Sequence, residues 1–373
     1  MKILHVYKTF LSETFGGVEQ TIYQIAKTTS AQFNHSVLSL TKERTAATSL
    51  HEGICTIRYK ENFSLASNSF SLSLMRDFKR LVARADVIHY HFPWPFADLL
   101  HVGWRIKKPS VVTYHSDIVR QQQLLYFYRP LMHRFLSKQN RIIATSPNYA
   151  ASSPILQRYK DKVSVIPIGL DKKSYPKTAD ECLQRWRQQF PGRFFLFVGV
   201  MRYYKGLHIL LQALAGTDFP VVIIGSGPME EELKREAQRL GLTRVYFAGP
   251  LPDEDKMALL ELCYAVVFPS HLRSEAFGIT LLEGAMAGKP LISAEIGTGT
   301  SYINRDKVTG LIVPPADPQG LQHAMRYLWE HPEEAARMGE HASVRYYELF
   351  TQEQMCTAYE KIYLEVVAES LQT

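Results

Sequence analysis

The chain has 373 residues, too many for one ordinary hydrophobic core, and its length fits two domains of roughly 150 to 190 residues each. A content of 46% hydrophobic and 21% charged residues is typical of a globular protein and excludes a disordered one. No apolar run approaches the ~18 residues that a membrane-spanning helix needs.

The charge balance predicts anionic partners. The formal net charge is +7 and the pI is near 9.0, which favours phosphates, nucleic acid or an acidic membrane surface. Lysines and arginines form no run of five or more, so we expect a phosphorylated ligand or a lipid surface and no nucleic acid. The cysteines form no CxxC pair, which argues against disulfides and a zinc site and favours a cytoplasmic location. They are Cys55, Cys182, Cys263 and Cys356.

The first half of the chain alternates short β-rich runs with helical stretches. Its opening, KILHVY, predicts a buried strand rather than a signal peptide. Runs this apolar, separated by helices, are typical of parallel sheets that are covered on both faces. The expected strands are residues 2–7, 35–40, 54–59, 86–92, 110–116, 141–146 and 163–169.

The pattern restarts after a polar, proline-bounded segment, 171–192, which we interpret as an interdomain linker plus one helix. We therefore predict an α/β protein of two doubly wound domains, 1–172 and 173–351, with a last helix at about 352–373 packing back on the first domain. Ligands are expected at the carboxyl ends of the strands, in a cleft between the domains. The second set of strands is 193–200, 220–227, 244–249, 265–270, 290–295 and 310–315, followed by helices over 317–372.

Several candidate site residues lie in the first domain. His115 ends an expected strand, where it either bonds its own loop or faces a ligand. His89 and His91 point to the same side of a strand and could bind a metal, but without a third ligand nearby we favour a pair lining the cleft. Gly16 and Gly17 open a helix, where they either shape a turn or let the backbone approach a ligand closely.

Two cations follow the first strand of the second domain. Arg202 and Lys205 lie three residues apart at a helix start, so their side chains can converge on one anion. The alternative is a pair of solvated surface charges. The acidic run Asp253 to Asp255 is interpreted as the start of a helix rather than a metal site. The GSGP at 225–228 lacks the third glycine of a dinucleotide fingerprint.

The segment SEAFGITLLEGAMAGKP, residues 274–290, contains two glutamates eight positions apart. Glu283 lies within an expected helix, 279–287, and its helical neighbours are uncharged, so a buried carboxylate there needs donors. Either protein groups supply them, or the carboxylate grips a ligand diol such as that of a ribose. Glu275 precedes a helix start that suits phosphate, where Gly278 permits close backbone approach. This spacing indicates a nucleotide sugar rather than a glycosidase substrate.

Five stretches of the chain together resemble glycosyltransferase family 4, whose members are retaining enzymes of the GT-B fold, with two facing Rossmann-like domains. The resemblance covers essentially the whole chain. Its most specific part is the pattern E-x-F-G-x-x-x-x-E, formed by Glu275, Phe277, Gly278 and Glu283. The other matching stretches are FGGVEQTIYQIA, VVTYHSD, VGVMRYYKGLHILLQAL and VTGLIVPPADPQGLQHAM.

The resemblance assigns roles to individual residues. It implies that Arg202 and Lys205 hold the donor diphosphate in place of a metal, so neither a metal nor another cofactor is expected. It implies that His115 contacts the donor sugar and that Glu275 orients the sugar hydroxyls; these four are the expected catalytic residues. The expected donor-binding set is Gly16, Gly17, Arg202, Lys205, Glu275, Phe277, Gly278, Ile279, Glu283 and Thr298.

The loop EIGTGTSYIN, with Thr298, and the stretch DVIHYHFPWPFADLL resemble bacterial mannosyltransferases that build O-antigen from GDP-mannose. The implied acceptor is a glycan on undecaprenyl diphosphate, reached by peripheral contact with the inner face of the cytoplasmic membrane. The aromatic and basic stretch 120–138 is a candidate for that contact, or an ordinary core-facing helix. The alternatives are a UDP-hexose or UDP-N-acetylhexosamine donor, a nucleotide-sugar epimerase, or a non-catalytic glycan-binding protein.

Overall fold

The computed structural model describes residues 1–11, 13, 16–43, 47–65, 68–118 and 122–372. The chain forms two compact units, each with its own sheet. One unit contains Met1–Gly169 and the C-terminal helix from Gln352 onward, and the other contains Leu170–Thr351. The sequence predicts the boundary after residue 172, and the contacts within the structure place it after Gly169.

The first unit is built on an eight-stranded sheet with the order β10-β9-β8-β7-β1-β2-β4-β3. The pairs from β10 through β4 are parallel, and every residue of the central strand β7 is buried. The edge strand β3, which was not predicted from the sequence, pairs antiparallel with β4, whereas the predicted strands of this unit all pair in parallel. The strands are β1 (Lys2–Val6), β2 (Asn34–Thr41), β3 (Ala47–His51), β4 (Ile54–Lys60), β7 (Val87–Phe92), β8 (Ser110–Tyr114), β9 (Arg141–Ala144) and β10 (Val163–Val165).

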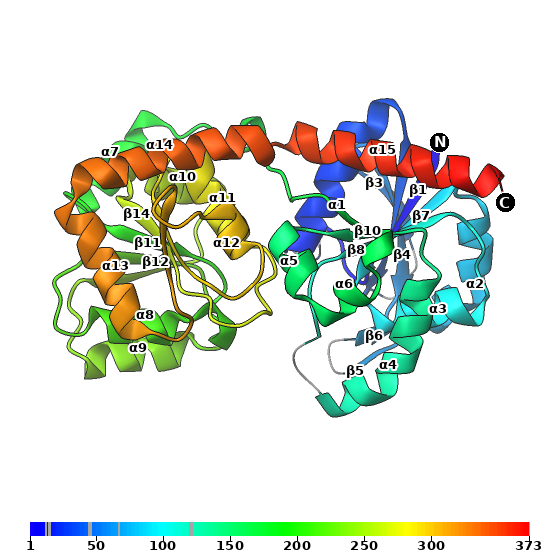
Figure 1. The fold of residues 1–373 in the computed structure, drawn as a ribbon, viewed down its shortest axis with the longest axis horizontal. Helices are drawn as coiled ribbons and strands as arrows, with labels where there is room; N and C mark the ends of the chain where they lie inside the picture. Colours follow the sequence, from blue (N-terminus) through cyan, green and yellow to red (C-terminus); the bar gives the residue numbers. More distant parts are fainter. Residues whose placement is uncertain (12, 14–15, 44–46, 66–67, 119–121, 373) are drawn as a thin grey trace. The chain divides into compact units, whose positions relative to one another are not determined.

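Helix α15 (Gln352–Leu371) belongs to this first unit, where it packs against α1, β7 and β8 (Figure 1). Tyr359 and Tyr363 are buried on its inner face and reach side chains of the sheet. The other elements of the unit are α1 (Gly17–Thr28), α2 (Leu72–Ala83), α3 (Pro95–Gly103), α4 (Gln122–Ser137), α5 (Pro147–Ser152), α6 (Pro154–Arg158), the hairpin β5 (Phe63–Leu65) and β6 (Asn68–Phe70), and the 3-10 turns η1 (Thr29–Ala31) and η2 (Lys160–Lys162).

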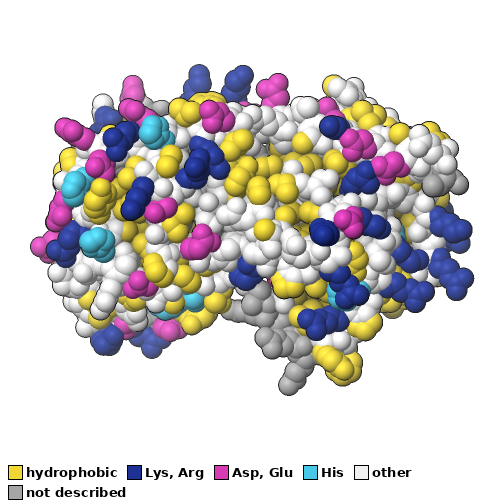
Figure 2. Space-filling view, viewed as in Figure 1, with side chains coloured by type: hydrophobic (Ala, Val, Ile, Leu, Met, Phe, Trp, Pro, Cys, Tyr) yellow, Lys and Arg dark blue, Asp and Glu magenta, His cyan; other side chains and the backbone are white. Residues whose placement is uncertain are grey.

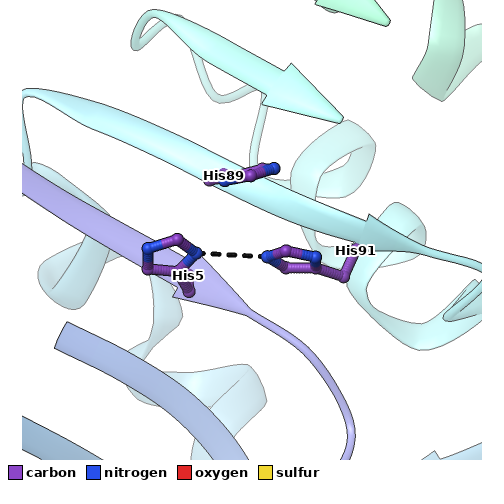
Figure 3. A group of neighbouring side chains, drawn as sticks. All are labelled: His5, His89 and His91. Carbon is purple, nitrogen blue, oxygen red and sulfur yellow. Dashed lines mark hydrogen bonds between the residues drawn. The ribbon is translucent and has the colours of Figure 1, made fainter. Parts of the chain in front are cut away.

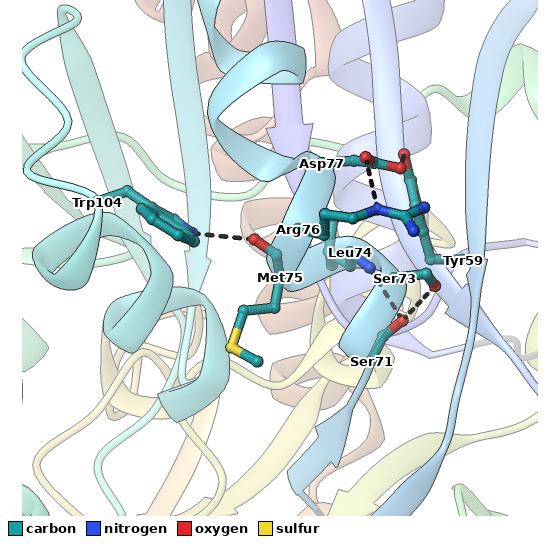
Figure 4. Close-up of polar contacts among 8 residues, drawn as sticks. All are labelled: Tyr59, Ser71, Ser73, Leu74, Met75, Arg76, Asp77 and Trp104. Atoms are coloured by element: carbon teal, nitrogen blue, oxygen red, sulfur yellow. Dashed lines mark hydrogen bonds and ion pairs between the residues drawn. The ribbon is translucent and has the colours of Figure 1, made fainter.

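Helix α2 shows how local signals set the bounds of an element. Ser71 caps it, since its hydroxyl oxygen accepts a hydrogen bond from the Leu74 amide at 3.3 Å. At the end of α3, the Trp104 indole N–H donates to the Met75 carbonyl oxygen at 3.0 Å, which joins the two helices (Figure 4).

The second unit has a six-stranded parallel sheet with the order β13-β12-β11-β14-β15-β16. The strand order reverses between β11 and β14, and in doubly wound sheets ligands bind beyond the carboxyl ends of the strands at that reversal. All six runs predicted for this half form strands. They are β11 (Phe195–Val198), β12 (Val221–Ile224), β13 (Val245–Gly249), β14 (Ala265–Phe268), β15 (Leu291–Ala294) and β16 (Gly310–Val313).

The helices of the second unit cover this sheet and bury its large core. Segment 171–192, expected as a linker plus one helix, contains α7, which packs on α10 within the unit. The elements are η3 (Lys172–Ser174), α7 (Asp180–Gln189), η4 (Tyr203–Lys205), α8 (Leu207–Leu214), α9 (Glu230–Arg239), α10 (Asp253–Leu262), α11 (Ile279–Met286), α12 (Thr300–Ile303), α13 (Pro318–Glu330) and α14 (Pro332–Leu349).

Candidate functional site

The site residues predicted in the second unit lie on three loops that leave neighbouring strands. Arg202 and Lys205 follow β11, the stretch Glu275 to Ile279 follows β14, and Thr298 follows β15. These strands are adjacent and parallel, so their carboxyl ends lie at one edge of the sheet, beside the reversal in strand order. The fold therefore brings these parts of the sequence together at the place where a ligand is expected.

Gly206 allows the first two loops to touch. Its φ of +71° lies in the left-handed region, and a Cβ atom at this position would lie 2.0 Å from the carbonyl oxygen of Pro269. The His271 amide also donates to the Tyr204 carbonyl oxygen at 3.0 Å, so the backbones of the two loops are hydrogen-bonded. Only glycine fits at position 206 without moving one loop away from the other.

This close approach places Lys205 against Glu275. The Lys205 ammonium nitrogen lies 2.5 Å from Oε2 of Glu275, and the two side chains are only 13% and 12% exposed. The Ser270 hydroxyl is 3.4 Å from the same oxygen, and the Lys205 ammonium lies 4.8 Å from the centre of the Phe268 ring. Two of the predicted catalytic residues thus form an ion pair that is largely shielded from water.

Arg202 is placed differently. It directly precedes the 3-10 turn η4 and is exposed, and its side chain has no hydrogen bond or ion pair with any residue that the structure describes. Its guanidinium is therefore available to an anion. The expected convergence of Arg202 and Lys205 on one anion stays a prediction.

The loop after β15 supports the Glu275 segment. The hydroxyl of Thr298, which is fully buried, donates to the Glu275 carbonyl oxygen at 2.7 Å, and the Gly299 amide donates to the Ala276 carbonyl oxygen at 2.8 Å. Phe277 is buried, and Gly278, with a φ of +99°, is the N-cap of α11, whose first residue is Ile279. Thr298 therefore helps to position Glu275 by a hydrogen bond to its backbone carbonyl group.

Glu283 is held by protein groups. Its Oε1 atom accepts hydrogen bonds from the Lys256 ammonium at 2.9 Å and from the Tyr175 hydroxyl at 3.1 Å, and its side chain is 7% exposed. These are the donors that a buried carboxylate requires, and they give Glu283 the structural role that we had left open. Oε2 has no hydrogen bond to a described residue, so a grip on a ribose diol stays a prediction that rests on this oxygen alone.

Sequence reasoning missed both partners of Glu283. Burial lowers the pKa of Lys256, but the charges and hydrogen bonds of Glu283 and, to a smaller extent, of Asp253 outweigh this, and the net pKa is raised. Burial and the Glu283 carboxylate raise the pKa of Tyr175 far above its ordinary value. The three side chains come from three separate elements, and the only signal in the sequence was that a carboxylate in an apolar helix needs a donor.

The acidic run at the start of α10 is structural, as expected from the sequence. Asp253, Glu254 and Asp255 form the first turn of this helix. Asp255 accepts a hydrogen bond from the Trp186 indole N–H at 2.7 Å and pairs with Arg185, which ties α7 to α10.

The predicted residues of the first unit also follow strand ends. Gly16 is the N-cap of α1, Gly17 is the first residue of that helix, and both are exposed. A Cβ atom at Gly16 would lie 2.5 Å from a carboxylate oxygen of Glu19, a buried residue that sequence reasoning missed. His115 directly follows β8 and is 8% exposed.

The interpretation of His89 and His91 as a pair lining a cleft is wrong. They are 0% and 1% exposed and lie within the unit. A third histidine that we had not expected, His5 on the neighbouring strand β1, has a ring nitrogen within 4.8 Å of theirs (Figure 3). The signal was present in the sequence, since KILHVY carries a histidine inside a predicted buried strand.

A metal does not fit this trio well, because all six ring nitrogens have hydrogen-bond partners. His5 bonds His91 and His35, His91 also bonds His115, and His89 bonds two hydroxyl groups. A cation would have to displace several of these bonds. Burial is the largest cause that lowers the pKa of each histidine, to about 4 for His35, to about 3 for His115 and well below the ordinary value for the others, so the rings are neutral at pH 7.

Two family models match the chain. The model described as Glycosyltransferase Family 4 matches residues 15–174, and the model described as Glycosyl transferases group 1 matches residues 183–345. Among curated proteins, the D-rhamnosyltransferase WbpZ of Pseudomonas aeruginosa is 56% identical over 352 residues, which cover 94% of this chain and 92% of the relative. The O-antigen chain mannosyltransferase C of Escherichia coli is 49% identical, with 97% and 98% covered.

Solved structures share the fold at lower identity. HepE of Anabaena, solved with UDP and glucose, superposes with a TM-score of 0.78 at 21% identity, covering 97% of this chain and 99% of that one. Sucrose-phosphate synthase of Thermosynechococcus elongatus superposes with a TM-score of 0.78 at 20% identity, covering 99% of each chain. At this identity the likeness concerns the fold alone.

Proposed function

This chain belongs to glycosyltransferase family 4 and has the GT-B fold with two Rossmann-like units, and from that premise we propose that it is an α-mannosyltransferase that uses GDP-mannose. The acceptor in this proposal is a hydroxyl of a lipid-linked glycan in O-antigen biosynthesis. Sugar transfer follows from the family, whereas the donor, the acceptor and the stereochemistry are parts of the proposal.

One observation carries the mechanism: the shielded Lys205–Glu275 ion pair, with the exposed Arg202 on the same loop. In the proposed reaction the bond between the anomeric carbon and the diphosphate oxygen breaks, and the acceptor oxygen forms a bond to that carbon on the same face. The departing phosphate takes the acceptor proton. Lys205 and Arg202 stabilise the charge that develops on the diphosphate, and Glu275 stabilises positive character at the anomeric carbon.

We also propose that the reaction needs no metal, because Lys205 and Arg202 supply the positive charge at the diphosphate. The acidic run at the start of α10 supports this, since Asp255 is already engaged by Arg185 and Trp186. Full turnover in EDTA is expected. A loss of turnover that added Mg²⁺ or Mn²⁺ restores would refute this part of the proposal.

The choice of sugar is supported from two sides. The relative from E. coli is named a mannosyltransferase and the relative from P. aeruginosa a D-rhamnosyltransferase. D-rhamnose is D-mannose without its 6-hydroxyl, so both names indicate a site shaped for the manno configuration. Transfer of D-rhamnose is the second candidate, favoured by the higher identity of 56%.

A donor panel tests the proposal. Purified protein is incubated with a lipid-linked acceptor mimic and GDP-mannose, GDP-D-rhamnose, UDP-glucose or UDP-N-acetylglucosamine, and the product is identified by mass spectrometry and NMR. The proposal expects an α-linked mannoside from GDP-mannose. A UDP-sugar as the best donor would contradict it, and preference for GDP-D-rhamnose would favour the second candidate.

The ratio of kcat/KM for the two GDP-sugars indicates how the 6-hydroxyl is bound. A site that hydrogen-bonds the 6-hydroxyl would give a ratio of roughly 10⁴, and an apolar pocket a ratio of about 10² at most.

The same assay separates the rival classes. An epimerase would change the donor sugar without an acceptor, and a glycan-binding protein would turn over none of the donors. The variant Glu275→Gln is the matched negative control, because it removes the carboxylate charge and keeps the shape of the side chain.

For the acceptor, we propose peripheral contact with the cytoplasmic face of the membrane, where an undecaprenyl diphosphate carrier would lie. Among the described residues, no helix combines the length and the apolar character needed to cross a bilayer. Tyr126 and Phe127 on α4 are 73% and 80% exposed, within the stretch that we had considered as a membrane contact. Arg76, Lys79 and Arg80 are exposed on α2, and Figure 2 shows basic side chains gathered over that helix.

Vesicle flotation tests this contact. The protein is expected to float with vesicles that contain anionic lipid and to float less with purely zwitterionic ones. The double variant Tyr126→Ser/Phe127→Ser should reduce flotation, and the control Tyr347→Ser, at a residue of the other unit that is 54% exposed, should not. Equal recovery with both vesicle types would refute an electrostatic contact.

A further inference from the structure

Four histidines form a continuous hydrogen-bonded chain across four strands of the first unit. Nε2 of His115 lies 2.9 Å from Nδ1 of His91, and Nε2 of His91 lies 3.1 Å from Nδ1 of His5. Nε2 of His5 lies 2.9 Å from Nδ1 of His35, and Nε2 of His35 lies 2.6 Å from the Thr29 hydroxyl. The chain therefore runs from the end of β8 through β7, β1 and β2 to the turn η1.

The direction of every bond in this chain is set at Thr29. The Thr29 hydroxyl donates its only hydrogen to the Ile25 carbonyl oxygen at 2.8 Å, so toward His35 it can only accept. Nε2 of His35 must therefore carry a hydrogen. Because a neutral imidazole carries one hydrogen, Nδ1 of His35 is an acceptor.

The same reasoning applies to each further histidine of the hydrogen-bonded chain. His5 must donate from Nε2 to His35, so its Nδ1 accepts from His91. His91 must donate from Nε2, so its Nδ1 accepts from Nε2 of His115. This requires neutral rings, which their burial ensures, since it lowers the pKa of all four. Nδ1 of His115 is then left with a free lone pair, and it has no hydrogen bond to any residue that the structure describes.

We propose that Thr29, His35, His5 and His91 are positioning residues that hold His115 as the tautomer with hydrogen on Nε2, so that Nδ1 accepts a hydrogen bond from a hydroxyl group of the bound sugar substrate. The ligand part of this inference rests on the proposed function, whereas the tautomer is a property of the free protein. A hydroxyl is the chemistry that fits, because a carboxylate or phosphate offers no hydrogen to a lone pair at neutral pH.

His89 provides an internal comparison. It is buried on the same face of the sheet as the chain but lies outside it, with Nδ1 2.7 Å from the Tyr363 hydroxyl and Nε2 2.7 Å from the Thr113 hydroxyl. Its ring packs beside that of His5, with centroids 5.0 Å apart. Replacing His89 disturbs the same core without breaking the hydrogen-bonded chain.

The tautomer can be measured by long-range ¹H–¹⁵N correlation NMR on protein labelled with [¹⁵N]histidine, without any substrate. The His115 signals are assigned by their absence in His115→Gln. We expect a protonated Nε2 and an unprotonated Nδ1 for His115. The opposite assignment would overturn the proposal, and the tautomer itself is read from the wild-type protein, since His115→Gln serves only to assign the signals.

Variants at Thr29 then test whether the hydrogen-bonded chain of histidines sets the tautomer of His115. Thr29→Val keeps the shape but removes the hydroxyl, so both directions of the chain become allowed and the two His115 nitrogen signals should move toward each other. Thr29→Ser keeps the hydroxyl and should restore the wild-type signals, and His89→Gln should leave them unchanged. Signals of His115 that stay the same in Thr29→Val would show that Thr29 is merely structural.

Turnover provides the functional readout. Thr29→Val is expected to lower kcat/KM by about tenfold, the lower end of the range for losing an outer partner of a metal-ligating histidine. Thr29→Ser should restore it. If no nucleotide sugar from the donor panel is turned over, the proposed function fails, and the NMR result still decides the tautomer. An unchanged kcat/KM in Thr29→Val, with shifted NMR signals, would overturn the role of Nδ1 in substrate binding.

Discussion

The Lys205 ammonium nitrogen lies 2.5 Å from the Glu275 carboxylate, although the two residues follow different strands of the second unit. The pair is nearly shielded from water, which strengthens the attraction between the charges. An incoming diphosphate would compete with Glu275 for this lysine. Binding of the donor and placement of the carboxylate are therefore linked in the proposed mechanism.

We predict that Lys205→Met lowers kcat by about 10²- to 10³-fold, as expected when one group that stabilises transition-state charge is removed. Lys205→Arg should retain part of the activity because it keeps the charge. Steady-state kinetics with the preferred donor measures both. The control is Lys234→Met on α9, where the lysine pairs with Glu230 on the same helix. A kcat for Lys205→Met equal to that of the control would contradict the role of Lys205.

Gly206 should be essential because of its surroundings and not only because of its backbone conformation. Gly206 and Gly216 have nearly the same φ, +71° and +72°, but a Cβ atom at Gly216 meets nothing within 4 Å. Gly216→Ala should therefore cost only about 1 kcal/mol of backbone strain, with little change in kcat. Gly206→Ala adds the clash with Pro269 and should lower both stability and kcat, as measured by urea unfolding and kinetics. Equal effects of the two variants would contradict this account.

Most of the fold was predictable because its signals are local. The buried runs of the second unit predict strands, and the helix expected at 279–287 appears as Ile279–Met286, with Gly278 directly before it and Gly288 two residues after its end. The edge strand β3, Ala47–His51, was missed because it alternates between half-buried and exposed residues and lacks an apolar run. Its place in the sheet depends on pairing with β4 rather than on its own sequence.

The residues of the site could be predicted from the sequence, but the ion pair that two of them form could not. The motif identified Lys205 and Glu275, but the approach of their loops depends on Gly206 fitting against Pro269. The buried histidines could be identified in the sequence, but the hydrogen bonds between them could not, for a similar reason. His35 and His91 become linked only when β2 and β7 are placed on either side of β1, and that order is a tertiary property.

Lys256 should contribute strongly to the stability of the second unit. Lys256→Met leaves the buried Glu283 carboxylate with only the Tyr175 hydroxyl as a described donor, and breaking a buried ion pair in this way costs about 3 to 5 kcal/mol. Urea unfolding followed by circular dichroism measures the loss. The double variant Lys256→Met/Glu283→Gln should recover part of it, because no unpaired charge stays buried.

The control for Lys256 is again Lys234→Met. Its ion pair with Glu230 joins neighbouring turns of α9, with the lysine side chain 41% exposed, so its loss should cost no more than about 0.5 kcal/mol. A double variant less stable than Lys256→Met alone would show that Glu283 is not the group that Lys256 neutralises.

The histidine chain should make the first unit sensitive to acid. Burial lowers the pKa of His35 from 6.5 to about 4, so between these values the unfolded state binds a proton that the folded state does not. Stability from this group is complete above pH 6.5 and is lost as pH falls toward 4, by at most about 1.4 kcal/mol per pH unit. Urea unfolding at pH 7.5, 6.5 and 5.5 should show this decline. His35→Gln should make it shallower, and His323→Gln, at an exposed residue of α13, should not. A decline as steep in His35→Gln as in the wild type would mean that other groups cause the loss.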